Sequence, residues 1–159
     1  MIILGIDPGT AITGFSILQR EQRSITLLDY GCIRTASGVP HYERLNEIAA
    51  DIETLIKKYR PTTCAIEKLF FSKNVKTAMN VAEVRGVLIH LAAKEGLTIH
   101  EYTPNEVKSN VTGDGKADKL QVQKMVKTIL SLKEIPRPDD AADAIAIALC
   151  HAEHIKIPK

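Results

Sequence analysis

The sequence predicts an α/β fold in which helices flank one five-stranded mixed sheet. Two observations indicate this class. Three segments rich in apolar, β-branched or aromatic residues follow one another directly in the first part of the chain, and two more are separated by stretches with helical spacing. Adjoining strands pair antiparallel through hairpins, whereas strands separated by a helix tend to run parallel. We therefore expect three antiparallel strands plus two parallel ones.

The expected strands are short apolar runs that end at turn-forming residues. The first is followed by the turn Asp7-Pro8-Gly9-Thr10, in which proline and glycine hold turn-favoured positions. The polar residues 20–23 predict a hairpin between the second strand and the third. The five expected strands cover residues 1–6, 12–19, 24–34, 62–67 and 97–102.

The expected helices are segments in which apolar residues recur every three or four positions. Pro61 lies just beyond the first helix and Gly96 just beyond the second, and both residue types commonly follow helix ends. The five expected helices cover residues 41–58, 74–94, 104–110, 117–130 and 140–155. Because the sequence has no internal repeat and no linker, residues 1–159 are expected to form one domain.

Length and composition limit the class of protein. The 159 residues are 45% apolar and 25% charged, which is typical of a globular domain. Asp7 interrupts the apolar run at the start, and no stretch approaches the roughly 20 apolar residues that cross a bilayer. Three cysteines, an odd number, lie in apolar segments, which predicts buried reduced thiols. We expect a cytoplasmic protein that makes no membrane contact.

Charge is distributed unevenly along the chain, whose net charge is +2. Residues 68–137 carry 12 basic and 7 acidic side chains, a net of +5, whereas residues 1–67 have a net of −1 and residues 138–159 a net of −2. A basic middle between two acidic ends suits a polyanion held across a metal-binding pocket. Ordinary surface charge is the alternative.

Four acidic residues lie where apolar segments end or a helix begins. Asp7 closes the first strand and Glu67 the fourth, and ligands gather beyond the carboxyl ends of parallel strands. Asp140 and Asp143 are three residues apart in a helical pattern and so share one helix face. Clustered carboxylates commonly hold divalent metal ions against a phosphate. The four acids therefore predict a metal-dependent nuclease.

Four motifs follow one another along nearly the whole chain. They are Ile3-Leu-Gly-Ile-Asp-Pro-Gly-Thr-Ala-Ile-Thr-Gly-Phe15, Ile66-Glu-Lys-Leu-Phe70, Arg85-Gly86 and Pro138-Asp-Asp-Ala-Ala-Asp-Ala144. Each is weak alone, since a strand that ends in Asp-x-Gly-Thr also opens the actin and sugar-kinase ATPases. Together, in this order and spacing, they resemble the RuvC family of Holliday-junction resolvases. The resemblance implies an RNase H-like fold, a homodimer and magnesium-dependent cutting of four-way DNA junctions.

The resemblance also assigns roles to the four acids. It implies that Asp7, Glu67, Asp140 and Asp143 are catalytic and bind two Mg²⁺ ions about 4 Å apart, with Mn²⁺ able to substitute. The chemistry needs metal ions because phosphodiesters repel nucleophiles and water is a poor nucleophile at neutral pH. Asp139 is a rival for Asp140 by adjacency, although the family spacing favours Asp140.

Three DNA contacts are implied as well. Lys108 and Lys119 match basic family positions that meet the DNA backbone near the cut, with solvated helix lysines as the alternative. Phe70 matches an aromatic residue that enters the junction and stacks on an unpaired base, a contact worth about 1–3 kcal/mol. Phe71 is its rival by adjacency, and one of the two is expected to point into the core.

The helix around Asn74–Lys94 has apolar residues over much of its circumference, more than one contact with a sheet covers. The resemblance assigns this helix to the homodimer, and a fully buried monomer helix is the alternative. Two symmetric sites would suit a reaction that nicks two strands of like polarity. Family members work beside the branch-migration proteins RuvA and RuvB, which are therefore expected partners.

Three other functions are open. An actin-class ATPase needs a second lobe to enclose its nucleotide, and the chain is short for one. A YqgF-type RNase H-like nuclease that acts on RNA would share the first motif, but not the Phe70 region together with the terminal Asp-Ala-Ala-Asp. A non-catalytic junction-binding module would lack one of the four acids, and all four are present.

Overall fold

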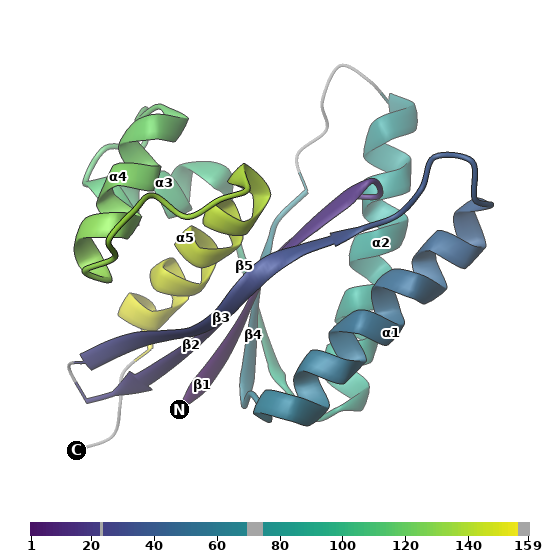
Figure 1. Ribbon diagram of the computed structural model, residues 1–159, viewed down its shortest axis with the longest axis horizontal. Helices are drawn as coiled ribbons and strands as arrows, with labels where there is room; N and C mark the ends of the chain where they lie inside the picture. The colour runs from purple at the N-terminus through teal and green to yellow at the C-terminus, as the bar shows by residue number, and fades with distance from the viewer. Residues whose placement is uncertain (23, 70–74, 156–159) are drawn as a thin grey trace.

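The computed structural model describes residues 1–22, 24–69 and 75–155, in which one sheet lies between two groups of helices (Figure 1). The strands are β1 (Ile2–Asp7), β2 (Ile12–Glu21), β3 (Ser24–Arg34), β4 (Thr63–Glu67) and β5 (Thr98–Tyr102). The helices are α1 (His41–Tyr59), α2 (Val75–Lys94), α3 (Pro104–Thr112), α4 (Lys119–Ile129) and α5 (Asp139–His154). All ten expected elements are present, and their ends lie within two residues of the expected ones.

The sheet has the strand order β3-β2-β1-β4-β5. Strand β2 pairs antiparallel with both β1 and β3, whereas β4 runs parallel to both β1 and β5. The predicted mixed sheet, with three antiparallel strands plus two parallel ones, is therefore confirmed. Because β1 and β4 are adjacent and parallel, their carboxyl ends meet at one edge of the sheet.

Each face of the sheet has its own hydrophobic core. Helices α1 and α2 cover one face, and α3, α4 and α5 cover the other (Figure 1). Successive side chains of a strand point to opposite faces. Along β1, Ile3 belongs to the α5 core and Leu4 to the α1–α2 core; along β4, Ala65 and Cys64 divide in the same way. The same alternation directs Asp7 and Glu67 toward α5.

Helix α5 lies close to the sheet, and every residue from Ala144 to Ala152 is buried. Small residues permit this approach. A Cβ atom on Gly5 of β1 would overlap the carbonyl oxygen of Ala144, and the Ser16 hydroxyl donates a hydrogen bond to the same oxygen at 2.8 Å. The short distance between helix and sheet therefore fixes where the first turn of α5 lies.

Two further expectations concern membranes and thiols. Within the described part of the chain, no helix is both long enough and apolar enough to cross a membrane. Cys64 and Cys150 are buried and Cys32 is half-buried, and all three have free thiols. Burial raises the pKa of the Cys64 thiol to about 12, so this side chain packs as a neutral apolar group.

Candidate active site

Two of the four predicted acids end neighbouring parallel strands. Asp7 is the last residue of β1 and Glu67 the last of β4, and the register places Ile6 opposite Ile66. Both side chains therefore leave the sheet at its carboxyl edge, on the face that α5 covers. In open sheets of this kind, this edge is where ligands bind.

The first turn of α5 brings the other two acids, Asp140 and Asp143, to the same edge. Gly14 of β2 pairs with Asp7 across the antiparallel ladder. A Cβ atom on Gly14 would overlap the Asp140 carbonyl oxygen, so the start of α5 rests directly on this strand pair. The glycine thus allows the helix to carry its acidic turn up to the end of β1.

Asp7 is affected electrostatically by the other three carboxylates. The pKa of Asp7 is raised to about 8, first by burial and then by the negative charges of Glu67, Asp143 and Asp140. Burial and the charge of Asp143 raise the pKa of Glu67, and burial is also the main cause of the raised pKa of Asp143. The structure therefore brings all four predicted acids into one site, where like charges oppose full ionisation.

Asp139 and Asp140 have different surroundings although they are adjacent. The Asp139 carboxylate accepts a hydrogen bond from Gln123 Nε2 at 3.1 Å and forms an ion pair with Arg137. The hydrogen bond from Gln123, followed by the charges of Lys119 and Arg137, lowers its pKa despite slight desolvation. Asp140, and not Asp139, is among the charges that act on Asp7. This geometry favours Asp140 as the member of the acidic cluster.

Both predicted lysines line the same cavity as two of the acids. This cavity, of about 250 Å³, is bordered by Lys108, Lys119, Glu67 and Asp143, and its remaining walls are mainly apolar. Lys119 Nζ lies 2.8 Å from Asp143 Oδ2. Burial alone would lower the pKa of Lys119, but its hydrogen bond and charge attraction to Asp143 raise it above the ordinary value. A protonated amine therefore faces the acidic cluster.

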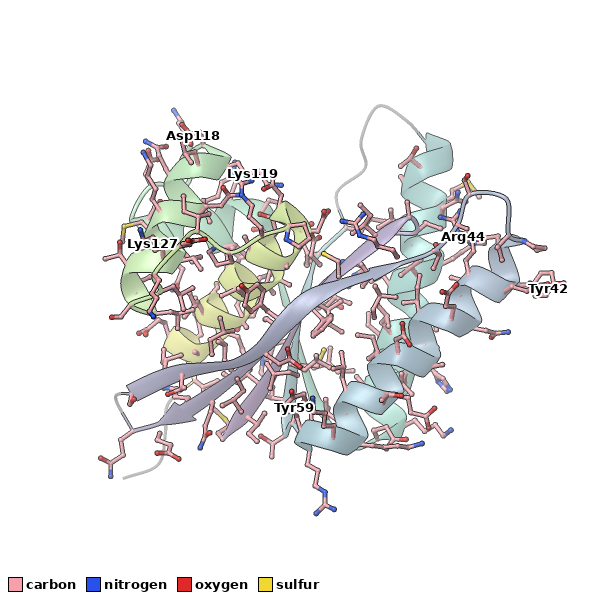
Figure 2. All side chains as sticks on the ribbon, in the orientation of Figure 1. Tyr42, Arg44, Tyr59, Asp118, Lys119 and Lys127 are labelled. Atoms are coloured by element: carbon pink, nitrogen blue, oxygen red, sulfur yellow. The ribbon has the colours of Figure 1, made fainter. Side chains whose placement is uncertain are left out.

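Local capping fixes the helices that carry the lysines. Lys119 is the first residue of α4, and the cap residue Asp118 forms a reciprocal capping box with Gln121. Figure 2 shows Lys119 near one end of the α4–α5 layer, with Asp118 beside it. Helix α3, which carries Lys108, begins with a second capping box, between Thr103 and Glu106. Both capping boxes provide hydrogen-bond partners for free N–H groups at the starts of α3 and α4, and so hold these helix ends in place.

A hydrogen-bond network that sequence reasoning missed supports the turn after Asp7. Thr13 Oγ1 donates to the Gly9 carbonyl at 2.6 Å. Thr35 Oγ1 donates to the Thr10 carbonyl at 2.6 Å, and Arg44 Nε of α1 donates to Thr35 Oγ1 at 2.7 Å. These partners come from three separate segments, so their spacing along the chain gives no signal. Sequence reasoning also missed Gly5 and Gly14, which allow α5 to pack closely on the sheet. Glycine inside a strand can signal such a close approach of another backbone.

The donor set fits a hard divalent cation. Carboxylate oxygens are the ligands that Mg²⁺ prefers. The pKa of Asp7 is raised mainly by burial and further by three neighbouring acids, and a bound cation would favour its ionised form. Among the described residues, no three histidine, cysteine or carboxylate side chains lie close enough together to share one ion. Magnesium commonly uses one or two carboxylates together with substrate phosphates and water, so this open arrangement is compatible with it.

One predicted DNA contact cannot be placed. Phe70 and its rival Phe71 lie outside the described residues. The strand that precedes them is well defined, and Lys68, directly after β4, donates its backbone N–H to the Tyr102 carbonyl at 2.7 Å.

Comparison with known proteins identifies the family. Residues 3–151 match the family model described as crossover junction endodeoxyribonuclease RuvC. The chain is 51% identical over 154 residues to the protein of that name from Pelotomaculum thermopropionicum, covering 97% of this chain and 94% of the relative. It is 52% identical over 152 residues to the protein of that name from Alkaliphilus oremlandii, covering 96% and 93%.

A solved structure agrees in fold over almost the same length. It is the Thermus thermophilus RuvC in complex with a Holliday junction substrate, at a TM-score of 0.91 and 35% identity, covering 96% of this chain and 93% of that one. The family-model match spans both strand-end acids, both lysines and the acidic turn of α5. The chain therefore belongs to the RuvC family of crossover junction endodeoxyribonucleases.

Proposed function

We propose that this protein resolves four-way (Holliday) DNA junctions by paired symmetric nicks, through two-metal-ion phosphodiester hydrolysis, in recombination and DNA repair. Membership of a family of junction endodeoxyribonucleases supports the reaction class. The observation that carries the site assignment is geometric: Asp7 and Glu67 end neighbouring parallel strands against the first turn of α5, beside a cavity that two lysines border. An RNA nuclease of the YqgF type and a non-catalytic binding module have no observation of their own in their favour.

The metal site is assigned to Asp7, Glu67, Asp140 and Asp143. We expect two Mg²⁺ ions, with Mn²⁺ as a substitute, because these ligands are hard oxygen donors on rigid strand and helix ends. When bound, the ions would activate water and neutralise charge on the leaving oxygen. The protein supplies a partly buried sheet edge at which Asp7 and Glu67 face the first turn of α5.

Lys119 and Lys108 would receive the scissile phosphate. Both border the cavity that Glu67 and Asp143 share, so their ammonium groups can lie against phosphate oxygens near the acids. A lysine acts there as a point charge and offsets negative charge that grows in the transition state. Lys119 would exchange its contact with Asp143 for a phosphate contact as DNA enters.

Two further assignments depend on the whole assembly. Phe70, just beyond Glu67 in sequence, would stack on an unpaired base of the junction. Helix α2 would pair two subunits through its outward face, where the Met79 side chain is 60% exposed and Gly86 has open space beside it. We also propose that residues 1–159 form a single domain that works in the cytoplasm beside RuvA and RuvB.

A junction assay tests the reaction. With Mg²⁺, the purified protein should nick a synthetic four-way junction symmetrically and leave a linear duplex of the same sequence largely intact. Asp7→Asn should abolish cleavage yet keep junction binding, because it removes a metal ligand and no positive charge. Equal cutting of junction and duplex, or of an RNA substrate in preference to both, would contradict the proposed function. Cleavage by Asp7→Asn at the normal rate would contradict the metal site.

A further inference from the structure

Arg85 reaches the end of strand β4 from the face of the sheet opposite α5. It lies on α2, one residue after Val84 and three before Leu88. Both of these side chains are fully buried in the α1–α2 core. The Arg85 side chain itself is only 19% exposed. A guanidinium group held this far from water needs specific polar partners.

The partners of Arg85 are the ends of two parallel strands. Its Nε donates a hydrogen bond to the backbone carbonyl of Glu67 at 3.2 Å, and its Nη2 lies 2.5 Å from Glu101 Oε1 on β5. The pairing of β4 with β1 stops at Ile66, so Glu67 lies one residue beyond the ladder on that side. Arg85 therefore binds the backbone of an active-site acid where the pairing with β1 has ended and the pairing with Tyr102 of β5 is the last one left.

The contact with Arg85 fixes the position of the Glu67 backbone. Other groups determine the pKa of the Glu67 carboxylate. Lys119 is the cation that lowers the pKa of Glu67, against burial and the charge of Asp143. Lys119 acts from the α5 side, whereas Arg85 holds the main chain from the α2 side. Loss of Arg85 would leave the Glu67 backbone held only by its pairing with β5, without removing the cation that faces its carboxylate.

We propose that Arg85 is a positioning residue for junction cleavage: it holds the Glu67 backbone in place and anchors it to helix α2. The inference rests on the proposed function and adds a residue that acts through Glu67 without touching substrate. The fixed fork of a guanidinium suits this task, because it can bind a carbonyl and a carboxylate at once. The pairing helix and the catalytic edge are thereby joined by one side chain.

The test compares Arg85→Met, which keeps a long unbranched side chain but has no donor, with Arg85→Lys, which keeps one donor group. At saturating protein, Arg85→Met should cut the junction about tenfold or more slowly, while its junction affinity stays within about twofold of the wild type. In a thermal melt without DNA, it should need severalfold more Mg²⁺ to reach half of the Mg²⁺-dependent rise in Tm. Arg85→Lys should recover part of both losses.

Glu53→Gln is the matched control, because it removes an exposed ion pair with Lys57 within α1 and leaves both α2 and β4 untouched. It should cut at the wild-type rate. A wild-type rate and Mg²⁺ response in Arg85→Met would overturn the proposal, as would a lysine variant no better than the methionine variant. A loss explained entirely by weaker junction binding would overturn it too. Failure of the proposed function is a separate result, since the wild type itself would then not cut junctions.

Discussion

At the residue scale, the two aspartates that open α5 have unlike environments and should respond differently to the same change. Asp140→Asn should slow junction cleavage by about a hundredfold or more, because it removes one of the proposed metal ligands. Asp139→Asn should stay within about threefold of the wild type. The Asp139 carboxylate is held by Gln123 and Arg137, lies 3.8 Å from Lys119 and is not among the charges that act on Asp7. Single-turnover rates at saturating Mg²⁺ provide the measurement. Comparable losses in the two variants would show that the cluster extends to Asp139.

Because of His151, the folding stability of the protein should decrease at acidic pH. It is fully buried, its two ring nitrogens lie 2.9 Å from Thr63 Oγ1 and 2.7 Å from Tyr102 Oη, and its ring packs against His100. Burial, followed by the charges of His100 and His154, lowers its pKa from 6.5 to about 4. Between these values the unfolded chain binds a proton that the native protein does not, so stability falls as pH falls from 6.5 toward 4.

The expected loss at His151 is about 2 kcal/mol between pH 7.5 and pH 5. Urea denaturation at the two pH values measures it. His151→Gln keeps hydrogen-bonding capacity but cannot gain this proton, so its stability should change less over the same interval. An equal change in the wild type and the variant would assign the acid sensitivity to other groups.

At the scale of elements, the contact between α5 and the sheet controls where the acidic turn lies. Gly14→Ala should slow cleavage by about tenfold or more, because the added methyl group would push the Asp140 carbonyl away from the end of β1. Gly38→Ala is a suitable control, since a Cβ atom there meets nothing within 4 Å. Far-ultraviolet circular dichroism should be unchanged in both variants, so the rates can be compared. A normal rate in Gly14→Ala would mean that α5 can shift without loss of the site.

Elements and strand-end acids could be predicted because their signals are local. Apolar spacing marks the ten helices and strands, and a carboxylate after an apolar run marks Asp7 and Glu67. The remaining parts of the site depend on contacts between distant segments, such as Ser16 with Ala144 or Arg85 with Glu67. The family spacing favoured Asp140 over Asp139, but the contact that holds Asp139 elsewhere could not be predicted, because Gln123 lies on another helix.

At the scale of the whole molecule, paired nicks require two copies of the site. The outward face of α2 offers a surface for pairing, and Gly86 on it has open space where a side chain could enter. Gly86→Glu should leave the monomer folded but place a charge in the pairing surface. We expect a monomer in size-exclusion chromatography and loss of symmetric nicking. Ala50→Glu, on the exposed side of α1, should stay dimeric; a dimeric Gly86→Glu protein would place the pairing surface elsewhere.

The glycines beneath α5 also limit how the protein can be engineered. Replacing glycine by alanine often raises stability by about 0.4–1 kcal/mol, because it restricts the unfolded chain. Gly5 and Gly14 have no room for that methyl group, so the usual gain would be reversed there. A search for heat-resistant variants should therefore leave both positions unchanged and turn to sites such as Gly38, where space is free. In this protein, Gly5 and Gly14 limit which substitutions beneath the active site can be made without displacing α5.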